Sequence, residues 1–377
     1  MPLLSELSDL RGRLQDDLFP HLEESLGPLG PRYQLLVTVI EMVPVTRFLA
    51  HCPGTRGRPP SDRACLARTF IAKAILKLPT TVDLIDRLRC DKTLRRLCGF
   101  QRLGAVPSEA TFSRAFDEFA RLELATRMHE ALIVATHKGQ LVEHISRDAT
   151  AIEAREKPVK VKALKRCRKK VKPQKGEPGW QTVRRLERQR EMTLAEMLAD
   201  LPRHCAVGAK PNAKGHKDFW VGYKLHLDIA DGGIPVTALL TSASLNDSQA
   251  AIPLATMTAR RVVNFYDLMD ASYKAPEIDA ACRDLGRVPI VPEQPRRDKR
   301  KKEAMAAEAK ARRAINFAAP EDVRYRQRTT AERVNARLKD EFGGRFVRVR
   351  GHAKVTCHLM FGILALTVDQ LMRLVPG

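Results

Sequence analysis

Three carboxylates in the second half of the sequence are candidates for binding divalent metal ions. Asp148 lies near the end of an extended stretch, residues 144–150, Asp270 ends a second one, residues 262–270, and Glu332 opens a helical stretch. Phosphodiester cleavage by two metal ions needs oxygen ligands that converge on ions about 3.5 to 4 Å apart. Mg²⁺ suits this chemistry because it binds a few carboxylates together with water and phosphate oxygens. Adjacent parallel strands would bring both aspartates to one sheet edge, where the helix could add Glu332.

Each of these acids also fits an ordinary structural role. Asp148 could close its strand in a turn, and Asp267 competes with Asp270 because it lies three residues earlier on the same run. The pattern Thr329-x-x-Glu332 matches a capping box, in which the glutamate side chain accepts a hydrogen bond from the threonine amide. Taken singly, none of the three acids identifies a metal site.

The residues around Glu332 favour the chemical role. Tyr325, Arg328, Glu332 and Lys339 are separated by three, four and seven positions. On a helix, steps of four and seven return to nearly the same face. A carboxylate among cations is what a metal ligand beside bound phosphates requires. A solvated charged helix face is the alternative.

These residues resemble the DDE transposases of bacterial insertion sequences, whose catalytic domain has a ribonuclease-H-like fold. The four residues of the preceding paragraph match the tyrosine, arginine, glutamate and lysine signature of that family at its own spacing. Residues 148–155 resemble the first catalytic motif and residues 270–273 the second, which favours Asp270 over Asp267. Residues 107–114 resemble the helical N-terminal region common in the same group.

The resemblance implies a reaction, a set of ligands and a partner. The reaction is hydrolysis at the ends of a mobile element, followed by attack of the freed 3′ hydroxyl on target DNA. The cofactor is a pair of Mg²⁺ ions, for which Mn²⁺ is expected to substitute. The partners are double-stranded DNA, as terminal repeats and as target, and a second copy of the chain in a synaptic homodimer. The implied catalytic metal ligands are Asp148, Asp270 and Glu332, and the implied DNA contacts are Tyr325, Arg328 and Lys339.

Two other functions remain open on the sequence. A catalytically inactive DNA-binding protein derived from a transposase would keep the basic surface, although the presence of all three acids argues against it. A nuclease of the same fold would cut DNA without joining strands. An RNA-binding protein is disfavoured because only 5% of the residues are aromatic and RNA recognition relies on aromatic stacking.

The residues before the first strand are expected to form an all-helical region. Apolar residues recur at helical spacing through residues 65–78 and 82–88, and the loop at 107–109 leads into another such stretch. We therefore predict a helical N-terminal domain over residues 1–140. In a basic protein such a unit is expected to bind DNA ends or to serve in dimerisation.

Residues 141–377 are predicted to form the catalytic domain, because strand and helix patterns alternate there. Apolar and polar residues alternate through residues 221–229, which predicts a strand with one buried and one wetter face. Asp231-Gly232-Gly233 then predicts a hairpin turn, with residues 234–240 as the partner strand. Residues 288–291 predict a short edge strand, since they contain a proline. The order of elements predicts an α/β fold, a mixed sheet flanked by helices and preceded by the all-α domain. This agrees with the ribonuclease-H-like fold that the resemblance implies.

Two basic segments interrupt the catalytic domain. In the first, a predicted arm over about residues 157–210, ten of the nineteen residues from Lys157 to Lys175 are Lys or Arg and none is acidic. Such a stretch cannot fold alone; we expect it to follow the DNA backbone, with a solvated linker as the alternative. The second, over about residues 296–318, is predicted to be a basic helical insert.

The composition agrees with a nucleic-acid partner. The formal net charge is +22, which a compact protein tolerates best beside a polyanion. No secretory signal or lipidation motif is recognisable, so we expect a cytoplasmic protein associated with the nucleoid and with no membrane partner. The apolar stretch from Val355 to Val375 contains charged residues and is predicted to be a buried core helix. The eight cysteines form no C-x-x-C pair, so they indicate neither a zinc site nor a disulfide framework.

Overall fold

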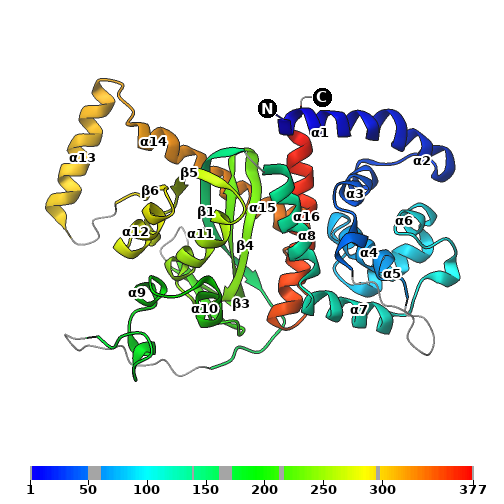
Figure 1. Ribbon diagram of the computed structural model, residues 1–377, viewed down its shortest axis with the longest axis horizontal. Coiled ribbons are helices and arrows are strands. Elements are labelled where there is room, and N and C mark those ends of the chain that lie inside the picture. Colours follow the sequence, from blue (N-terminus) through cyan, green and yellow to red (C-terminus); the bar gives the residue numbers. More distant parts are fainter. Residues whose placement is uncertain are drawn as a thin grey trace.

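The computed structural model has a central β-sheet with helices on both sides of it (Figure 1). The N-terminal helices lie on one side, and helices α9 to α13 lie on the other. This is the predicted α/β fold, a ribonuclease-H-like mixed sheet flanked by helices and preceded by a helical N-terminal region. The structure describes residues 2–49, 61–137, 140–160, 172–211, 216–293 and 298–375.

In the described residues, the strands form one mixed sheet in the order β2-β3-β1-β5-β6, and β4 also pairs with β3. β1 runs antiparallel to β3 and parallel to β5, and β6 is parallel to β5 at the edge. The predicted parallel pairing of the two aspartate-bearing segments is therefore confirmed. The strands are β1 (Leu141–Glu153), β2 (Ala206–Pro211), β3 (Lys217–Ala230), β4 (Ile234–Ser242), β5 (Val263–Leu268) and β6 (Val288–Ile290).

The hairpin of β3 and β4 forms where the alternation predicts it. Gly232 and Gly233 in the connecting turn both adopt a φ of 75°, a left-handed conformation that glycine takes without the cost of a Cβ. Ile234 then pairs back with Ala230. The alternation in β3 predicts one buried and one wetter face, and this prediction is wrong, because His226 and Asp228 on its polar side are also fully buried.

The first strand is longer than its sequence pattern predicts. Asp148 does not end β1, because the strand continues to Glu153. The pairing of β1 with β5 stops at Ser146, whereas its pairing with the longer β3 continues to Glu153. Asp148 therefore lies inside the strand, just beyond the end of its parallel pairing, and the prediction that it closes the strand is wrong.

The N-terminal region is helical, as predicted. Its core includes a group of phenylalanines in which Phe70 of α4 contacts three rings of α7 and also Phe361 near the C-terminus. The helices are α1 (Pro2–Gly12), η1 (Arg13–Leu18), α2 (Phe19–Leu26), α3 (Pro31–Met42), α4 (Arg63–Ile75), α5 (Thr81–Cys90), α6 (Lys92–Leu97), α7 (Glu109–Arg121) and α8 (Leu124–His137).

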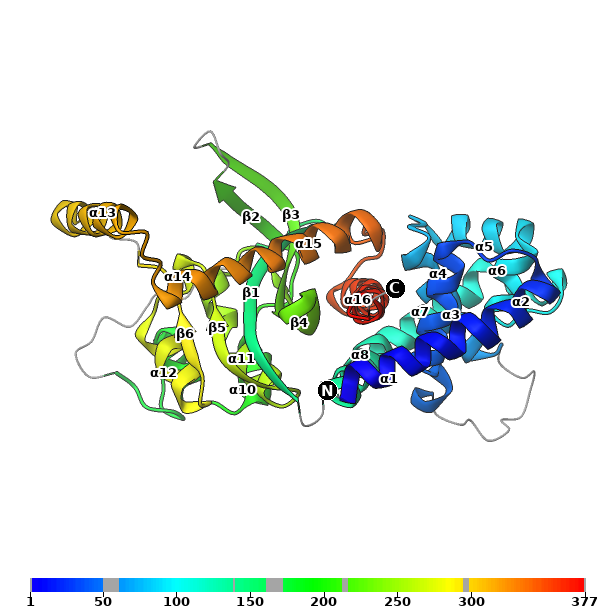
Figure 2. The same cartoon turned by 90° about the horizontal axis from the view of Figure 1, so that it is seen from above.

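The C-terminal helix α16 (His352–Arg373) is buried between the sheet and the N-terminal helices (Figures 1 and 2). It contacts α3, α4, α7 and α8 on one side and β4 on the other. In the described residues it is the one helix long and apolar enough to cross a membrane, and 72% of its most apolar window is buried inside the protein. One hydrophobic core thus includes residues from both sides of position 140, while the division into two domains remains a prediction.

The other helices pack on the sheet or extend from it. Residues 161–171 of the predicted basic arm lie outside the described residues, but its later part forms α9, α10 and β2. The predicted basic insert is helical as α13, which stands away from the sheet and buries none of its residues (Figure 2). These helices are α9 (Arg185–Gln189), α10 (Leu194–Asp200), α11 (Ala251–Ala259), α12 (Pro276–Asp284), α13 (Lys299–Ala314), α14 (Pro320–Tyr325) and α15 (Thr329–Glu341).

Candidate active site

The parallel pairing of β1 with β5 brings two of the predicted acids to the same place. Ser146 pairs with Leu268, and Asp148 and Asp270 each follow two positions later. Asp270 begins the short turn Ala271–Tyr273, and its Oδ1 accepts a hydrogen bond of 2.8 Å from the Ser272 amide. Since parallel strands end at the same edge of a sheet, both carboxylates lie near that edge.

A helical run that passes β1 supplies the third acid. α14, the short turn Arg326–Arg328 and α15 follow one another without a break, and Arg328 itself has helical angles of φ −59° and ψ −27°. Thr329 is therefore not an N-cap residue, because the chain is already helical before it, and no side-chain cap forms at the start of α15. The capping-box alternative for Glu332 is excluded, and its carboxylate instead accepts a hydrogen bond from Arg328.

The guanidinium of Arg328 contacts all three predicted acids. Its Nη2 lies 3.0 Å from Oδ1 of Asp148 and 3.9 Å from Oδ2 of Asp270. Its Nη1 lies 3.3 Å from Oε1 of Glu332. Acids that are far apart in the sequence therefore converge on one side chain, which belongs to the same four-residue pattern as Glu332.

The cluster has more negative than positive charge, because three carboxylates face one guanidinium. Burial raises the pKa of Asp148, Arg328 lowers it, and the charges of Asp270 and Glu332 raise it further. The side chain of Asp148 is 19% exposed, whereas that of Glu332 is 64% exposed. The site is thus anchored by a nearly buried carboxylate and opens to solvent on the side of the helix.

Asn335 completes the surroundings of Asp148, and the sequence analysis missed it. Its Nδ2 donates a hydrogen bond of 3.0 Å to Oδ2 of Asp148. Its Oδ1 is buried and has no hydrogen-bond partner in the part of the chain that the structure describes. The signal was present in the sequence, because Asn335 follows Glu332 by three positions and so lies close to it on the helix surface.

These residues fit a divalent metal ion by their chemistry. Within the described ranges, no group of three His, Cys, Asp or Glu side chains is arranged as ready ligands, since the three carboxylates instead meet the Arg328 guanidinium. Their oxygens, and the unpaired amide oxygen of Asn335, are the hard donors that Mg²⁺ prefers. A second cation would also reduce the mutual repulsion of the carboxylates.

Tyr325 and Lys339 occupy different positions relative to this cluster. Tyr325 is half-buried beside Arg328; burial and the charges of Asp270 and Glu332 raise its pKa, while Arg328 lowers it. Its hydroxyl therefore keeps its proton at neutral pH. Lys339 lies two turns further along α15 and contacts none of the three acids among the described residues.

The surroundings of Lys339 are cationic. Burial lowers the pKa of Lys339, and the charges of Arg345 and Lys210 lower it further, while Glu153 raises it. Lys339 is therefore one of several cations that lie beyond the carboxylate cluster, toward β2. Such a group suits contacts with successive phosphates of a strand.

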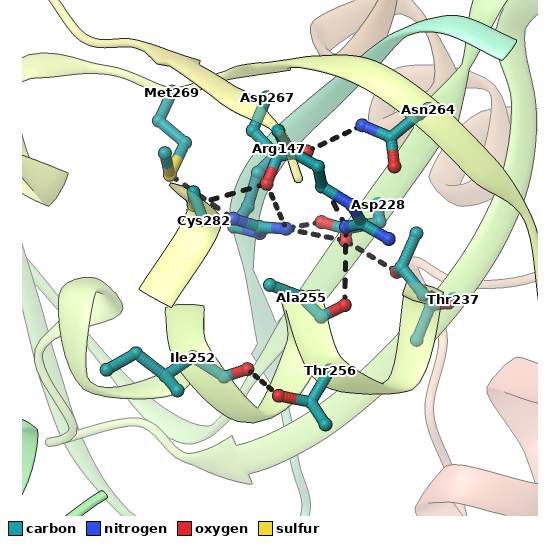
Figure 3. Close-up of polar contacts among 12 residues, drawn as sticks. Arg147, Asp228, Thr237, Ile252, Ala255, Thr256, Asn264, Asp267, Met269 and Cys282 are labelled. Carbon is teal, nitrogen blue, oxygen red and sulfur yellow. Dashed lines mark hydrogen bonds and ion pairs between the residues drawn. The ribbon is translucent and has the colours of Figure 1, made fainter. Parts of the chain in front are cut away.

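On the opposite face of β1, the neighbouring residue Arg147 forms a buried ion-pair network (Figure 3). Two hydrogen bonds of 2.8 Å join it to Asp228, which lies directly opposite on β3. Asp267 of β5 is 3.7 Å away, and all three side chains are fully buried. Asp267 therefore belongs to this network and not to the cluster around Arg328.

The network connects the three central strands, since Arg147, Asp228 and Asp267 lie on β1, β3 and β5. Thr258 of α11 donates a hydrogen bond of 2.6 Å to Asp228, and Asn264 donates one of 2.9 Å to Asp267. Buried charges are tolerated only with such partners. The network thus holds β1 at the position that presents Asp148 to α15.

Comparison with known protein families agrees with this geometry. The family model described as a transposase DDE domain matches residues 143–368, from β1 into α16. This chain belongs to the DDE transposase family. A second model, described as a transposase domain (DUF772), matches residues 22–118 of the helical N-terminal region. The resemblance to DDE transposases that the sequence shows is thereby confirmed, in both the catalytic region and the helical N-terminal region. Neither a curated protein nor a solved structure matches this chain significantly.

Proposed function

We propose that this transposase cleaves DNA at the ends of its element and joins the freed 3′ hydroxyl to target DNA. The observation that carries the proposal is the convergence of Asp148, Asp270 and Glu332 on the single guanidinium of Arg328. Membership of the DDE transposase family supports the same chemistry. The reaction uses Mg²⁺, and Mn²⁺ is expected to substitute.

In this proposal the three carboxylates hold two metal ions, with Asp148 as the ligand fixed most firmly. Its two oxygens already accept hydrogen bonds from Arg328 and Asn335, so its orientation is set before any ion binds. When bound, two divalent ions activate the attacking oxygen and stabilise the leaving one. Glu332, being the most exposed of the three, can turn toward the substrate.

Arg328, Tyr325 and Lys339 are the proposed phosphate contacts. A phosphate can replace the carboxylates as the partner of the Arg328 guanidinium, because both accept paired hydrogen bonds from its planar fork. The Tyr325 hydroxyl beside it can donate to the same phosphate. Lys339, two turns away, would contact a phosphate further along the strand.

The proposed partners are double-stranded DNA, as terminal repeats and target, and a second copy of the chain in the synaptic complex. The net charge of +22 supports the DNA partner. The helical N-terminal domain, residues 1–140, is proposed to bind DNA ends or to serve in dimerisation. The protein would act in the cytoplasm, on the nucleoid.

The test is incubation of the purified protein with a supercoiled plasmid that carries the element's ends, with Mg²⁺ and a second target molecule. A transposase cuts and produces joined molecules, a nuclease only cuts, and an inactive binder only shifts the DNA in a gel. Glu332→Gln should abolish cutting and leave DNA affinity nearly intact, because the change keeps the shape and removes a metal ligand. Asp340→Asn is the control, since Asp340 is an exposed acid on the same helix that pairs with Arg345. Cutting by Glu332→Gln at the control rate would refute the assignment.

A further inference from the structure

A cavity of about 360 Å³ lies at the junction of the N-terminal helices and the chain that follows the active-site helix. One wall comes from α4, α5 and α7, which fall within residues 22–118. The other comes from residues 348–350 and the start of α16, which fall within residues 143–368. A ligand in this cavity would therefore touch both regions that match transposase families.

The cavity wall is strongly cationic. Four of its lining residues are Lys73, Arg348, Arg350 and Lys354, and Glu109 is the one acid among those that line it. Lys354 pairs with Asp117 at 3.1 Å. In the part of the chain that the structure describes, Arg348 and Arg350 form no ion pair. The wall thus presents more positive charge than its own acids neutralise.

Lys73 is the most unusual of these cations, because it is only 7% exposed. Its Nζ donates a hydrogen bond of 3.3 Å to the carbonyl oxygen of Pro79, and among the described residues it forms no salt bridge. Burial lowers the pKa of Lys73 to about 8, and the charge of Asp83, which lies beyond salt-bridge distance, offsets this only in part. A buried ammonium group without a carboxylate partner is costly, and an anion in the cavity would supply the missing charge.

Two helix starts add to the positive potential. Thr81 is the first residue of α5 and Glu109 the first of α7, and both line the cavity. The N-terminus of a helix carries a partial positive charge and suits anion binding. Phe70 and Phe116 form an apolar part of the wall, against which the sugar or base of a nucleotide could pack.

We propose that this cavity binds a phosphate group of a DNA strand outside the active site, so that one strand is held by the N-terminal and catalytic regions together. The inference rests on the proposed function, because it assumes DNA as the substrate. A DNA strand is favoured over a free anion because further cations lie on the segment that joins the active-site helix to the cavity wall. Lys339 on α15 and Arg345 just after it lie on the segment that leads from Glu332 to Arg348.

The first test removes the two exposed cations of the wall from the full-length chain. Arg348→Gln/Arg350→Gln is compared with wild type for affinity to a fluorescent duplex, measured by anisotropy at several salt concentrations in EDTA. The logarithm of the binding constant falls linearly with the logarithm of the salt concentration, and loss of one phosphate contact makes this salt slope shallower by about 0.9. At about 0.1 M salt this corresponds to about an eightfold loss of affinity. Arg260→Gln/Arg283→Gln is the matched control, because both arginines are exposed, neither lines the cavity and both lie outside the N-terminal region proposed to bind DNA. Equal losses in the two double variants would overturn the inference.

A second variant, Lys73→Met, tests the buried cation. It should weaken DNA binding by a similar factor and yet raise the melting temperature of the free protein, because it removes a buried charge that has no acidic partner. A merely structural lysine would give a lower melting temperature and unchanged affinity, which would contradict the inference. If Lys73→Met fails to fold, the Arg348→Gln/Arg350→Gln comparison decides.

A third arm separates a DNA phosphate from a free anion. Inorganic phosphate should raise the melting temperature of the wild type relative to chloride at equal ionic strength, and less so in Arg348→Gln/Arg350→Gln. Stabilisation by phosphate with unchanged DNA affinity in the variants would overturn the assignment to DNA. Because affinity is measured in EDTA, failure here differs from failure of the proposed function, which would appear as a wild type that binds DNA without cutting or joining it.

Discussion

The buried ion pair between Arg147 and Asp228 should contribute far more to stability than the exposed ion pairs of this protein. Both side chains are 0% exposed, and two hydrogen bonds of 2.8 Å join them. Arg147→Met keeps much of the side-chain volume but leaves the carboxylate of Asp228 without its cation. Removing one partner of a buried pair costs about 3 to 5 kcal/mol.

The remaining contacts place the expected loss near the lower end of that range. Asp228 keeps the hydroxyl of Thr258 at 2.6 Å. Asp267 keeps Asn264 at 2.9 Å and Arg287 at 3.8 Å. We therefore expect a loss of about 3 kcal/mol, a large part of the roughly 5 to 15 kcal/mol that folded proteins have in total.

The assay is the free energy of unfolding in urea at neutral pH. Arg89→Met is the control, because Arg89 and Asp86 are 3.8 Å apart and their side chains are 56% and 65% exposed; it should cost less than about 1 kcal/mol. Arg147→Met/Asp228→Leu should recover most of the loss, since it also removes the unpaired charge. A loss for Arg147→Met no larger than that of the control would refute the reasoning.

Two further predictions concern pH and DNA contact. Burial lowers the pKa of His129 to about 3 and that of His226 and His358 to about 4. As the pH falls, these histidines are therefore protonated in the unfolded chain before they are protonated in the folded one. The free energy of unfolding should therefore fall as the pH drops from about 6.5 toward 4, by up to roughly 4 kcal/mol per pH unit. Urea midpoints that do not change over this pH range would contradict the prediction. Lys339→Ala should lower the salt slope of DNA binding by about one unit. Arg283→Ala, which removes an exposed cation on α12, should leave the slope unchanged. Equal slopes for the two variants would place Lys339 in solvent.

Much of the sheet could be predicted from the sequence, because local patterns decide it. The alternation in residues 221–229 and the two glycines of the turn specify the β3–β4 hairpin without reference to the rest of the chain. The parallel pairing of β1 with β5 followed from the order of the elements, since the segment between them is long enough for a crossover. That pairing is what brings Asp148 near Asp270.

The features that escaped prediction depend on partners far away in the sequence. The length of β1 is set by β3, which pairs with it beyond Asp148. The capping-box pattern at Thr329 is overridden because the preceding residues are already helical. Arg147 and Asp228 are charged residues in strands, and only the packing of α11 on the sheet decides that they are buried.

The adjacent positions 147 and 148 explain why a fully buried network and a partly exposed cluster coexist on one strand. Successive side chains of a strand point to opposite faces, so a slip of one residue would exchange their environments. Asp148 would then face Asp228, and two carboxylates would be buried together without Arg147 between them, while Arg147 would enter the cluster around Arg328. Burying two carboxylates side by side is electrostatically unfavourable. The pairing of Arg147 with Asp228 therefore fixes the register of β1, and it is this register that directs Asp148 toward Asp270 and Glu332.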